Sequence, residues 1–279
     1  MKISIAEYAG FCFGVKRAID QIEKLNKNNK KNIYVLGKLI HNPQVIKDLE
    51  KKGVKSIEIE NIDNLNKNST IIISAHGVPD NLITKLKKKG FKIIDSTCPL
   101  VKKVHNITKE AEKEGYKIII FGDKEHTEVK GIKGNLKHAI VISDINEINK
   151  LDEKKNYCLV SQTTQDVEKF DKLIKELKKS IKNLKIYDTI CIPTKQRQSS
   201  SLELAKKSDL MLIVGGKISA NTKRLAQRCS EFTQTYHIET EKELKSEWFK
   251  NKENIGITAG ASTPDYIINK VFNKIKNEF

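Results

Sequence analysis

The chain has 279 residues, of which 38% are hydrophobic and 31% charged, and its formal net charge is +17. This length favours two or three α/β units over a single small core. No segment approaches the ~20 consecutive apolar residues of a membrane-spanning helix, and the N-terminal residues MKISIAEYAG lack the apolar region of a signal peptide. We therefore expect a folded cytoplasmic protein with no membrane partner.

The positive charge is compatible with a nucleic-acid-binding protein, but its composition argues against one. Only Arg17, Arg197, Arg224 and Arg228 are arginine, the residue that nucleic-acid readers favour for paired contacts to bases and phosphates. The lysines are spread over nearly every expected helix, which is typical of solvated helix faces in a lysine-rich proteome. We expect no nucleic-acid partner. A lysine-rich nucleic-acid-binding protein and a basic docking surface for an acidic protein remain alternative interpretations.

Short apolar runs alternate with amphipathic stretches along the whole chain. Helical spacing covers residues 15–25, 82–86 and 167–177. The strand-like runs are Ile33–Leu36, Thr70–Ser74, Lys92–Ile94, Lys117–Phe121, Ala139–Ile142, Tyr157–Val160, Leu184–Tyr187, Leu210–Val214 and Ile255–Thr258. Such alternation predicts an α/β fold with mainly parallel sheets that are covered on both faces.

Three of the five cysteines recur at similar intervals. Cys12, Cys98 and Cys191 are 86 and 93 residues apart, and each directly precedes a helical pattern. Pro99 and Pro193 follow the second and third cysteine at positions suited to a first helical turn. This regularity predicts three similar α/β domains, spanning residues 1–97, 98–190 and 191–279, each presenting one cysteine at the start of a helix.

A thiolate at a helix N-terminus is stabilised by the exposed amides and can bind a metal. Three such thiolates from separate segments suit an iron–sulfur cluster with one iron left open, because four cysteines saturate the usual cluster. The chain has no pair of cysteines two residues apart, so spacing alone leaves unrelated thiols as an alternative. Cys158, inside an apolar run, is interpreted as a small buried hydrophobe, and Cys229 as an incidental thiol.

Polar side chains follow six of the apolar runs, at the sheet edge where open α/β folds bind ligands. Histidine, hydroxyl and amide donors beside glycine-containing turns suit a phosphorylated ligand, and a carboxylic acid there can relay protons. These side chains are His41 in GKLIHNP, His76 in AHGVP, His126 and Glu128 in GDKEHTEVKG, Thr163 in SQTT, Ser219 and Asn221 in GGKISANT, and Ser262 in AGASTP.

Each of these motifs also has a purely structural interpretation. Ser262 fits a helix cap equally well, His76 before Gly77 fits a turn, and Glu128 fits an ordinary surface carboxylate. His105 and His138 lie outside the motifs and are expected to be structural or exposed.

Taken together, the motifs resemble those of the 4-hydroxy-3-methylbut-2-enyl diphosphate reductase family. They occur in order from about residue 8 to 266: AGFCFGVKRAID, GKLIHNPQV, SAHGVP, DSTCPLVKKVH, GDKEHTEVKG, SQTT, DTIC followed by RQ, and AGASTP. The resemblance implies a trefoil of three similar α/β domains around a central [4Fe–4S] cluster. It also implies an iron–sulfur oxidoreductase of the methylerythritol phosphate pathway of isoprenoid synthesis.

The same resemblance assigns roles to individual residues. It implies that the cluster is bound by three cysteines, that Glu128 supplies protons and that Thr163 contacts the allylic hydroxyl. It assigns the diphosphate to His41, His76, His126, Ser219, Asn221 and Ser262, and the metal to Cys12, Cys98 and Cys191. The implied reaction converts (E)-4-hydroxy-3-methylbut-2-enyl diphosphate to isopentenyl and dimethylallyl diphosphate, with electrons from a donor such as ferredoxin or flavodoxin.

Two positions depart from the family pattern. Ala220 stands where the family commonly has a second serine, which removes one donor, and Pro193-Thr194 replaces Ala-Thr after the third cysteine. Another three-cysteine iron–sulfur enzyme, such as a quinolinate-synthase-like dehydratase, is the alternative activity.

Overall fold

The computed structural model describes residues 1–27 and 32–278. Its strands form three parallel sheets of four strands each, which we name by their first central strand. The β2 sheet contains β2 (Ile33–Leu36), β3 (Val54–Ile57), β4 (Thr70–Ile73) and β5 (Lys92–Asp95); the β6 sheet contains β6 (Lys117–Phe121), β7 (Ala139–Ile142), β8 (Tyr157–Ser161) and β9 (Leu184–Ile186); and the β10 sheet contains β10 (Leu210–Val214), β11 (Gln234–Ile238), β12 (Asn254–Ala259) and β1 (Lys2–Ile5).

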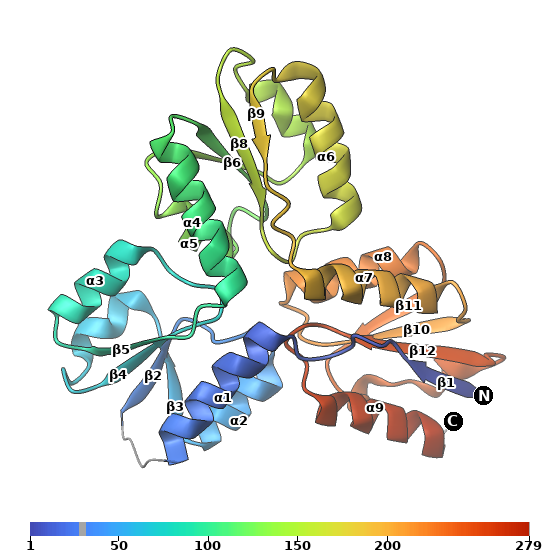
Figure 1. The fold of residues 1–279 in the computed structure, drawn as a ribbon. Coiled ribbons are helices and arrows are strands. Elements are labelled where there is room, and N and C mark those ends of the chain that lie inside the picture. Colours follow the sequence, from blue (N-terminus) through green and yellow to red (C-terminus); the bar gives the residue numbers. More distant parts are fainter. Residues whose placement is uncertain (28–31, 279) are drawn as a thin grey trace. The chain divides into compact units, whose positions relative to one another are not determined.

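Helices connect and cover these strands (Figure 1). In the described part of the chain they are α1 (Phe13–Lys27), α2 (Pro43–Lys51), α3 (Asp80–Lys88), α4 (Pro99–Lys113), α5 (Thr127–Lys133), α6 (Val167–Ser180), α7 (Ile192–Ala205), α8 (Ala220–Ser230) and α9 (Asp265–Glu278). None of them has the length and apolar character that crossing a bilayer requires. All nine apolar runs noted in the sequence are strands, which confirms the prediction of parallel α/β layers.

The three sheets share one strand order. They run β3-β2-β4-β5, β7-β6-β8-β9 and β11-β10-β12-β1. In each sheet the chain passes from the second strand of this order to the first strand on one side, and then to the third strand on the other side. In the β10 sheet, the fourth position is filled by β1, whose Lys2 pairs with Asn254 of β12. The N-terminal strand therefore completes a sheet whose other strands lie near the C-terminal end of the sequence.

The cores follow from the alternation of side chains along buried strands. In β6, Ile119 and Phe121 pack against α6, whereas Ile118 and Ile120 face α4 and α5 on the opposite side of the sheet (Figure 1). In β10, Leu212 and Val214 face α9, and Met211 and Ile213 face α7 and α8. Central strands buried on both faces explain why these runs are continuously apolar.

The described residues divide into two compact units. One contains Met1–Lys16, Ile40–Lys52 and Ile192–Phe279, with the β10 sheet, and the other contains Arg17–Leu39 and Gly53–Cys191, with the β2 and β6 sheets. We refer to them as unit 1 and unit 2 and describe each by itself. Domain boundaries near residues 97 and 190 stay a prediction.

Candidate active site

The three cysteines singled out in the sequence occupy the same position in the repeated topology. Each follows the fourth strand of a sheet and directly precedes a helix, at the start of α1, α4 or α7. In each case the cysteine amide donates a hydrogen bond to the carbonyl two residues beyond the third strand. These bonds join Cys12 to Ala261 (3.1 Å), Cys98 to Ala75 (3.0 Å) and Cys191 to Thr163 (3.0 Å).

Exposure separates these three cysteines from the other two. Cys12, Cys98 and Cys191 are partly exposed, whereas Cys158 and Cys229 are fully buried within apolar clusters. Burial raises the pKa of Cys158 to about 11 and that of Cys229 to about 12. Because the thiolate is the metal-binding form, three accessible thiols at helix N-termini suit iron and sulfide, and two buried, protonated thiols do not.

Two of the four arginines support the cysteine loops. Arg197 on α7 is 4% exposed and donates from Nη2 to the Gly10 carbonyl (2.6 Å), two residues before Cys12. Arg17 on α1 donates from Nη1 to the Thr97 carbonyl (3.1 Å), one residue before Cys98. In a chain rich in lysine, a rigid guanidinium at these places holds backbone that a flexible ammonium would hold less well.

In unit 2, Glu128 and Thr163 form a buried pair. Glu128 is the second residue of α5, Thr163 follows β8, and the two residues are 2% and 5% exposed. The Thr163 amide donates to Oε1 of Glu128 (2.6 Å), and the Thr163 hydroxyl donates to Oε2 (2.9 Å). Since the Thr163 carbonyl also accepts the Cys191 amide, this pair is tied directly to a cysteine loop.

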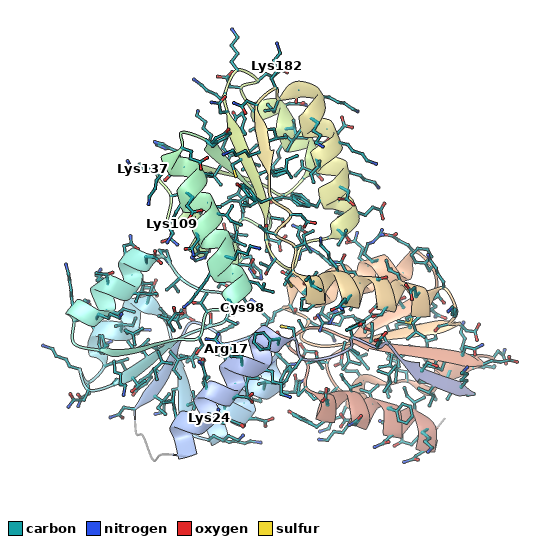
Figure 2. The ribbon with its side chains drawn as sticks, viewed as in Figure 1. Arg17, Lys24, Cys98, Lys109, Lys137 and Lys182 are labelled. Carbon is teal, nitrogen blue, oxygen red and sulfur yellow. The ribbon has the colours of Figure 1, made fainter. Side chains whose placement is uncertain are left out.

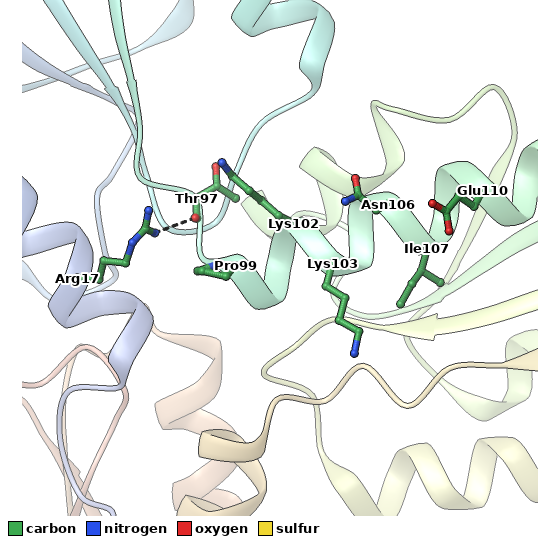
Figure 3. A pocket seen from close by; sticks show the side chains of 8 residues that line it. All are labelled: Arg17, Thr97, Pro99, Lys102, Lys103, Asn106, Ile107 and Glu110. Carbon is green, nitrogen blue, oxygen red and sulfur yellow. Dashed lines mark hydrogen bonds between the residues drawn. The ribbon is translucent and has the colours of Figure 1, made fainter.

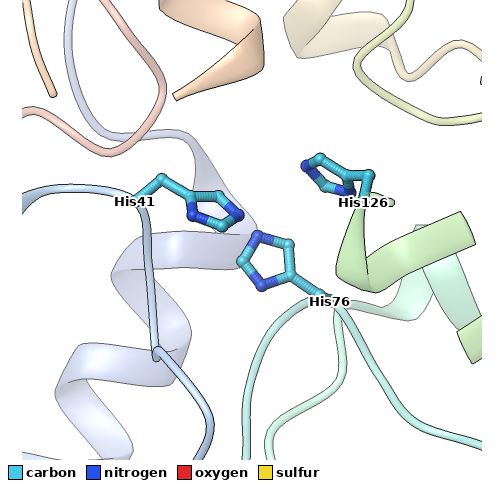
Figure 4. A group of neighbouring side chains, drawn as sticks. All are labelled: His41, His76 and His126. Carbon is cyan, nitrogen blue, oxygen red and sulfur yellow. The ribbon is translucent and has the colours of Figure 1, made fainter. Parts of the chain in front are cut away.

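His126 and His76 extend the same group of contacts. The Glu128 amide donates to Nδ1 of His126 (3.2 Å), which places the proton of the neutral ring on Nε2, where it is a donor. The rings of His126 and His76 meet edge to face with centroids 5.4 Å apart, as Figure 4 shows; the figure also draws His41, which belongs to unit 1. Unit 2 thus joins a thiol, a carboxylic acid, a hydroxyl and two imidazoles.

In unit 1, Ser219 and Asn221 lie at the start of α8. Ser219 caps the helix by accepting from the Thr222 amide (3.3 Å), which leaves its hydroxyl proton available as a donor. Nδ2 of Asn221 is buried and has no partner among the described residues. A buried donor beside a helix N-terminus fits an anion, because the N-terminal amides favour negative charge.

Ser262 and His41 lie in two further loops of unit 1. Ser262 follows β12, and its hydroxyl is half-buried without a hydrogen-bond partner in the described residues, so the helix-cap interpretation finds no support. His41 precedes Asn42, which caps α2 by accepting from the Gln44 and Val45 amides. A Cβ added at Gly216 would lie 2.3 Å from the His41 carbonyl oxygen, so a glycine is needed where these two loops meet.

All the predicted polar residues follow the two central strands of a sheet, where the strand order reverses. The chain continues from β2 to His41, from β4 to His76, from β6 to His126 and Glu128, and from β8 to Thr163. It continues from β10 to Ser219 and Asn221, and from β12 to Ser262. Ligands of open parallel sheets bind at the carboxyl ends of the strands at this reversal.

The pattern of the LytB protein family matches residues 3–276. The chain belongs to this family. Its relatives include the 4-hydroxy-3-methylbut-2-enyl diphosphate reductases of Caldanaerobacter subterraneus subsp. tengcongensis (47% identity) and of Thermoanaerobacter sp. strain X514 (48% identity). Both matches cover 99% of this chain and 97% of the relative.

Two solved structures share the fold of this LytB family member. The (E)-4-hydroxy-3-methyl-but-2-enyl diphosphate reductase described as the terminal enzyme of the non-mevalonate pathway is 42% identical, with a TM-score of 0.73 and 99% of each chain covered. The E-1-hydroxy-2-methyl-but-2-enyl-4-diphosphate reductase from Plasmodium falciparum is 33% identical, with a TM-score of 0.93. That match covers 99% of this chain and 88% of the other.

Two arginines that were not predicted as site residues support the loops of predicted cysteines. Arg17 and Arg197 stand inside the motifs AGFCFGVKR and DTIC…RQ, and their rarity in a lysine-rich chain is the signal that identifies them. The expectation that His105 and His138 are structural or exposed is confirmed. His105 is buried, its Nδ1 lies 3.0 Å from Nδ2 of Asn135, and burial lowers its pKa, whereas His138 is exposed.

The two departures from the family pattern are both accommodated. Ala220 is the first residue of α8, next to the cap Ser219. Pro193 is the second residue of α7, where a missing N–H leaves no helical bond unmade.

We expect the five cysteines to divide into two groups in alkylation. In iron-free folded protein at about pH 8, iodoacetamide should label Cys12, Cys98 and Cys191, while burial and raised pKa values protect Cys158 and Cys229. Peptide mass spectrometry of a time course measures the order of labelling. Comparable labelling of all five thiols would contradict the division.

We expect Arg197→Gln to loosen the Cys12 loop and Arg17→Gln to loosen the Cys98 loop. In Arg197→Gln, losing the buried bond to Gly10 should lower the free energy of unfolding by about 1–3 kcal/mol and accelerate alkylation of Cys12 more than that of the other cysteines. Urea unfolding and the same labelling experiment measure both effects.

Arg228→Gln is the matched control for these arginine variants, because it removes an i,i+3 pair with Glu231 on α8. It should leave the alkylation rates of Cys12, Cys98 and Cys191 as in the wild type. If Arg17→Gln and Arg197→Gln accelerated the alkylation of every cysteine equally, the arginines would stabilise the whole fold and not one loop each.

Proposed function

We propose that the chain catalyses the reductive dehydration of (E)-4-hydroxy-3-methylbut-2-enyl diphosphate to isopentenyl and dimethylallyl diphosphate. The observation that carries the proposal is 47–48% identity, over 99% of the chain, to proteins named for this reductase activity. Membership of the same family leaves a quinolinate-synthase-like dehydratase or a nucleic-acid-binding protein without support.

We propose Cys12, Cys98 and Cys191 as the three protein ligands of one [4Fe–4S] cluster. When bound, such a cluster would supply electrons one at a time. It would also offer one Lewis-acidic iron that no cysteine coordinates. The three thiols are the accessible ones, each opens a helix, and each has the same amide hydrogen bond. Their chemistry therefore fits the group.

The diphosphate is assigned to the donors at the strand ends: His41, His76, His126, Ser219, Asn221 and Ser262. The buried, unpartnered Nδ2 of Asn221 and the free hydroxyl of Ser262 need acceptors, and phosphate oxygens supply them. Hydrogen bonds to a charged group contribute about 1.5–3 kcal/mol each. Several such bonds compensate for the donor that is absent at Ala220.

Glu128 and Thr163 are assigned to proton delivery. The reaction takes up two electrons and two protons: one C–O bond breaks, one C–H bond forms, and the oxygen leaves as water. Thr163 donates its hydroxyl proton to Glu128, so its oxygen can accept from the allylic hydroxyl of the substrate. A proton on Glu128 can then pass through Thr163 to the departing oxygen.

The electron donor is proposed to be a small acidic redox protein such as ferredoxin or flavodoxin, because the chain is strongly basic. A cytoplasmic location, predicted from the sequence, suits an oxygen-sensitive iron–sulfur enzyme.

Anaerobic purification tests the proposed activity. The protein should contain about four iron and four sulfide per chain and should convert the allylic diphosphate with dithionite-reduced methyl viologen as electron source. Colourless protein without iron, and without turnover after reconstitution, would exclude the proposal.

We expect Glu128→Gln to abolish most turnover while the protein keeps its cluster and still binds the substrate. Glutamine can still accept from the Thr163 amide and can bond the Thr163 hydroxyl through its own N–H, but it carries no transferable acid proton. Turnover should fall about 10²- to 10⁴-fold, with iron content and substrate affinity unchanged.

Glu125→Gln, three residues earlier in the same motif, is the control for this prediction. Glu125 is exposed and pairs with Lys130, so its amide variant should keep full turnover. Near-normal turnover of Glu128→Gln would show that another group supplies the proton.

A further inference from the structure

The general positive charge does not by itself mark a docking site. Lysines lie all over unit 2, and Figure 2 labels four that come from separate segments: Lys24, Lys109, Lys137 and Lys182. Many are paired with carboxylates, for example Lys109 with Asp80 (2.7 Å). A specific surface needs unpaired cations gathered beside a functional residue.

One hollow of unit 2 meets this condition. It has a volume of about 440 Å³, is bordered by α1 and α4, and lies against the Cys98 loop, because Thr97 and Pro99 on either side of that cysteine both line it (Figure 3). Its lining residues are Arg17, Thr97, Pro99, Lys102, Lys103, Asn106, Ile107 and Glu110.

The charges in this hollow are only partly compensated. Lys102 pairs with Asp95 (2.5 Å). Burial raises the pKa of Asp95, but hydrogen bonds from Lys102 and Thr97 outweigh it and hold that pKa below its ordinary value, so the pair is ionised at neutral pH. Within the described residues Arg17 and Lys103 have no carboxylate partner, and Glu110 is the only acidic residue in the lining. The hollow is therefore net positive.

Apolar side chains accompany these cations. Pro99 is exposed, Leu100 is 39% exposed, and Ile107 lines the hollow. Exposed apolar side chains beside cations suit a transient protein interface, in which the charges steer the encounter.

We propose that this hollow is the docking surface of an acidic, ferredoxin-type electron carrier, with Lys103 as a principal contact. The inference rests on the proposed function, since it makes the Cys98 loop the entry for electrons. Two carriers dock in turn and each is oxidised by one electron; with two protons, these electrons replace the C–O bond of the substrate by a C–H bond, and the oxygen leaves as water. An approach beside a proposed cluster ligand keeps the path of the electron short.

Charge reversal at Lys103 tests the proposal by binding as well as by activity. The dissociation constant of an oxidised bacterial ferredoxin of net negative charge is measured with the iron-loaded protein at about 0.02 M and about 0.5 M salt. Lys103→Glu should raise it on the order of tenfold at low salt, Lys103→Ala less, and high salt should remove the difference. Ferredoxin-driven kcat/KM should fall in parallel, with turnover by methyl viologen unchanged.

Lys175→Glu is the matched control. Lys175 is an exposed, unpaired lysine of α6 that lines a second hollow of unit 2, about 560 Å³ in volume, so the variant makes the same change in net charge elsewhere. It should alter the dissociation constant less than twofold.

Equal effects of the Lys103 and Lys175 reversals, or no effect of either, would overturn the proposed surface. Failure of the proposed function is a separate result, because it would appear as wild-type protein without methyl-viologen-driven turnover.

Discussion

A backbone hydrogen bond that occurs three times fixes the loops that carry the three proposed cluster ligands. The amides of Cys12, Cys98 and Cys191 each donate to a carbonyl two residues beyond the third strand of their sheet. The bond sets the path of the chain between the last strand and the next helix, and the thiol is carried at that helix start. Since an unpaired buried amide or carbonyl costs about 1–3 kcal/mol, each loop has a strong preference for this one path.

The same strand order that repeats this bond also collects the polar residues. In each sheet the two central strands are flanked on both sides, and their buried runs end in loops that carry the donors. Thr163 shows how closely the two sets are connected. Its carbonyl accepts the Cys191 amide, while its amide and hydroxyl both donate to Glu128. A residue assigned to proton transfer is thereby held by a residue assigned to metal binding.

Much of this architecture could be predicted from the sequence, and the rest could not for identifiable reasons. Continuous apolar runs such as Leu210–Val214 identified the central strands, because burial on both faces leaves no polar alternation. The edge strands β1, β3 and β11 were missed, since their partly exposed residues give short, polar sequences. The pairing of β1 with β12 joins segments some 250 residues apart, and no local sequence pattern predicts a pairing over that distance.

The site was predictable in its residue types but not in its contacts. Motif spacing pointed to Glu128 and Thr163, yet the double hydrogen bond between them depends on how β6 and β8 lie side by side. Arg17 and Arg197 reach loops 80 and 187 residues away in the sequence, which only the folded chain brings to them.

We propose that three cysteines bind one cluster and leave one iron without a protein thiolate. Mössbauer spectroscopy of anaerobically reconstituted protein with ⁵⁷Fe tests it most directly, in the absence and presence of the diphosphate substrate. We expect two classes of iron in a ratio of about three to one, with only the minor class changed by substrate. Four indistinguishable irons, or a spectrum that substrate leaves unchanged, would contradict it.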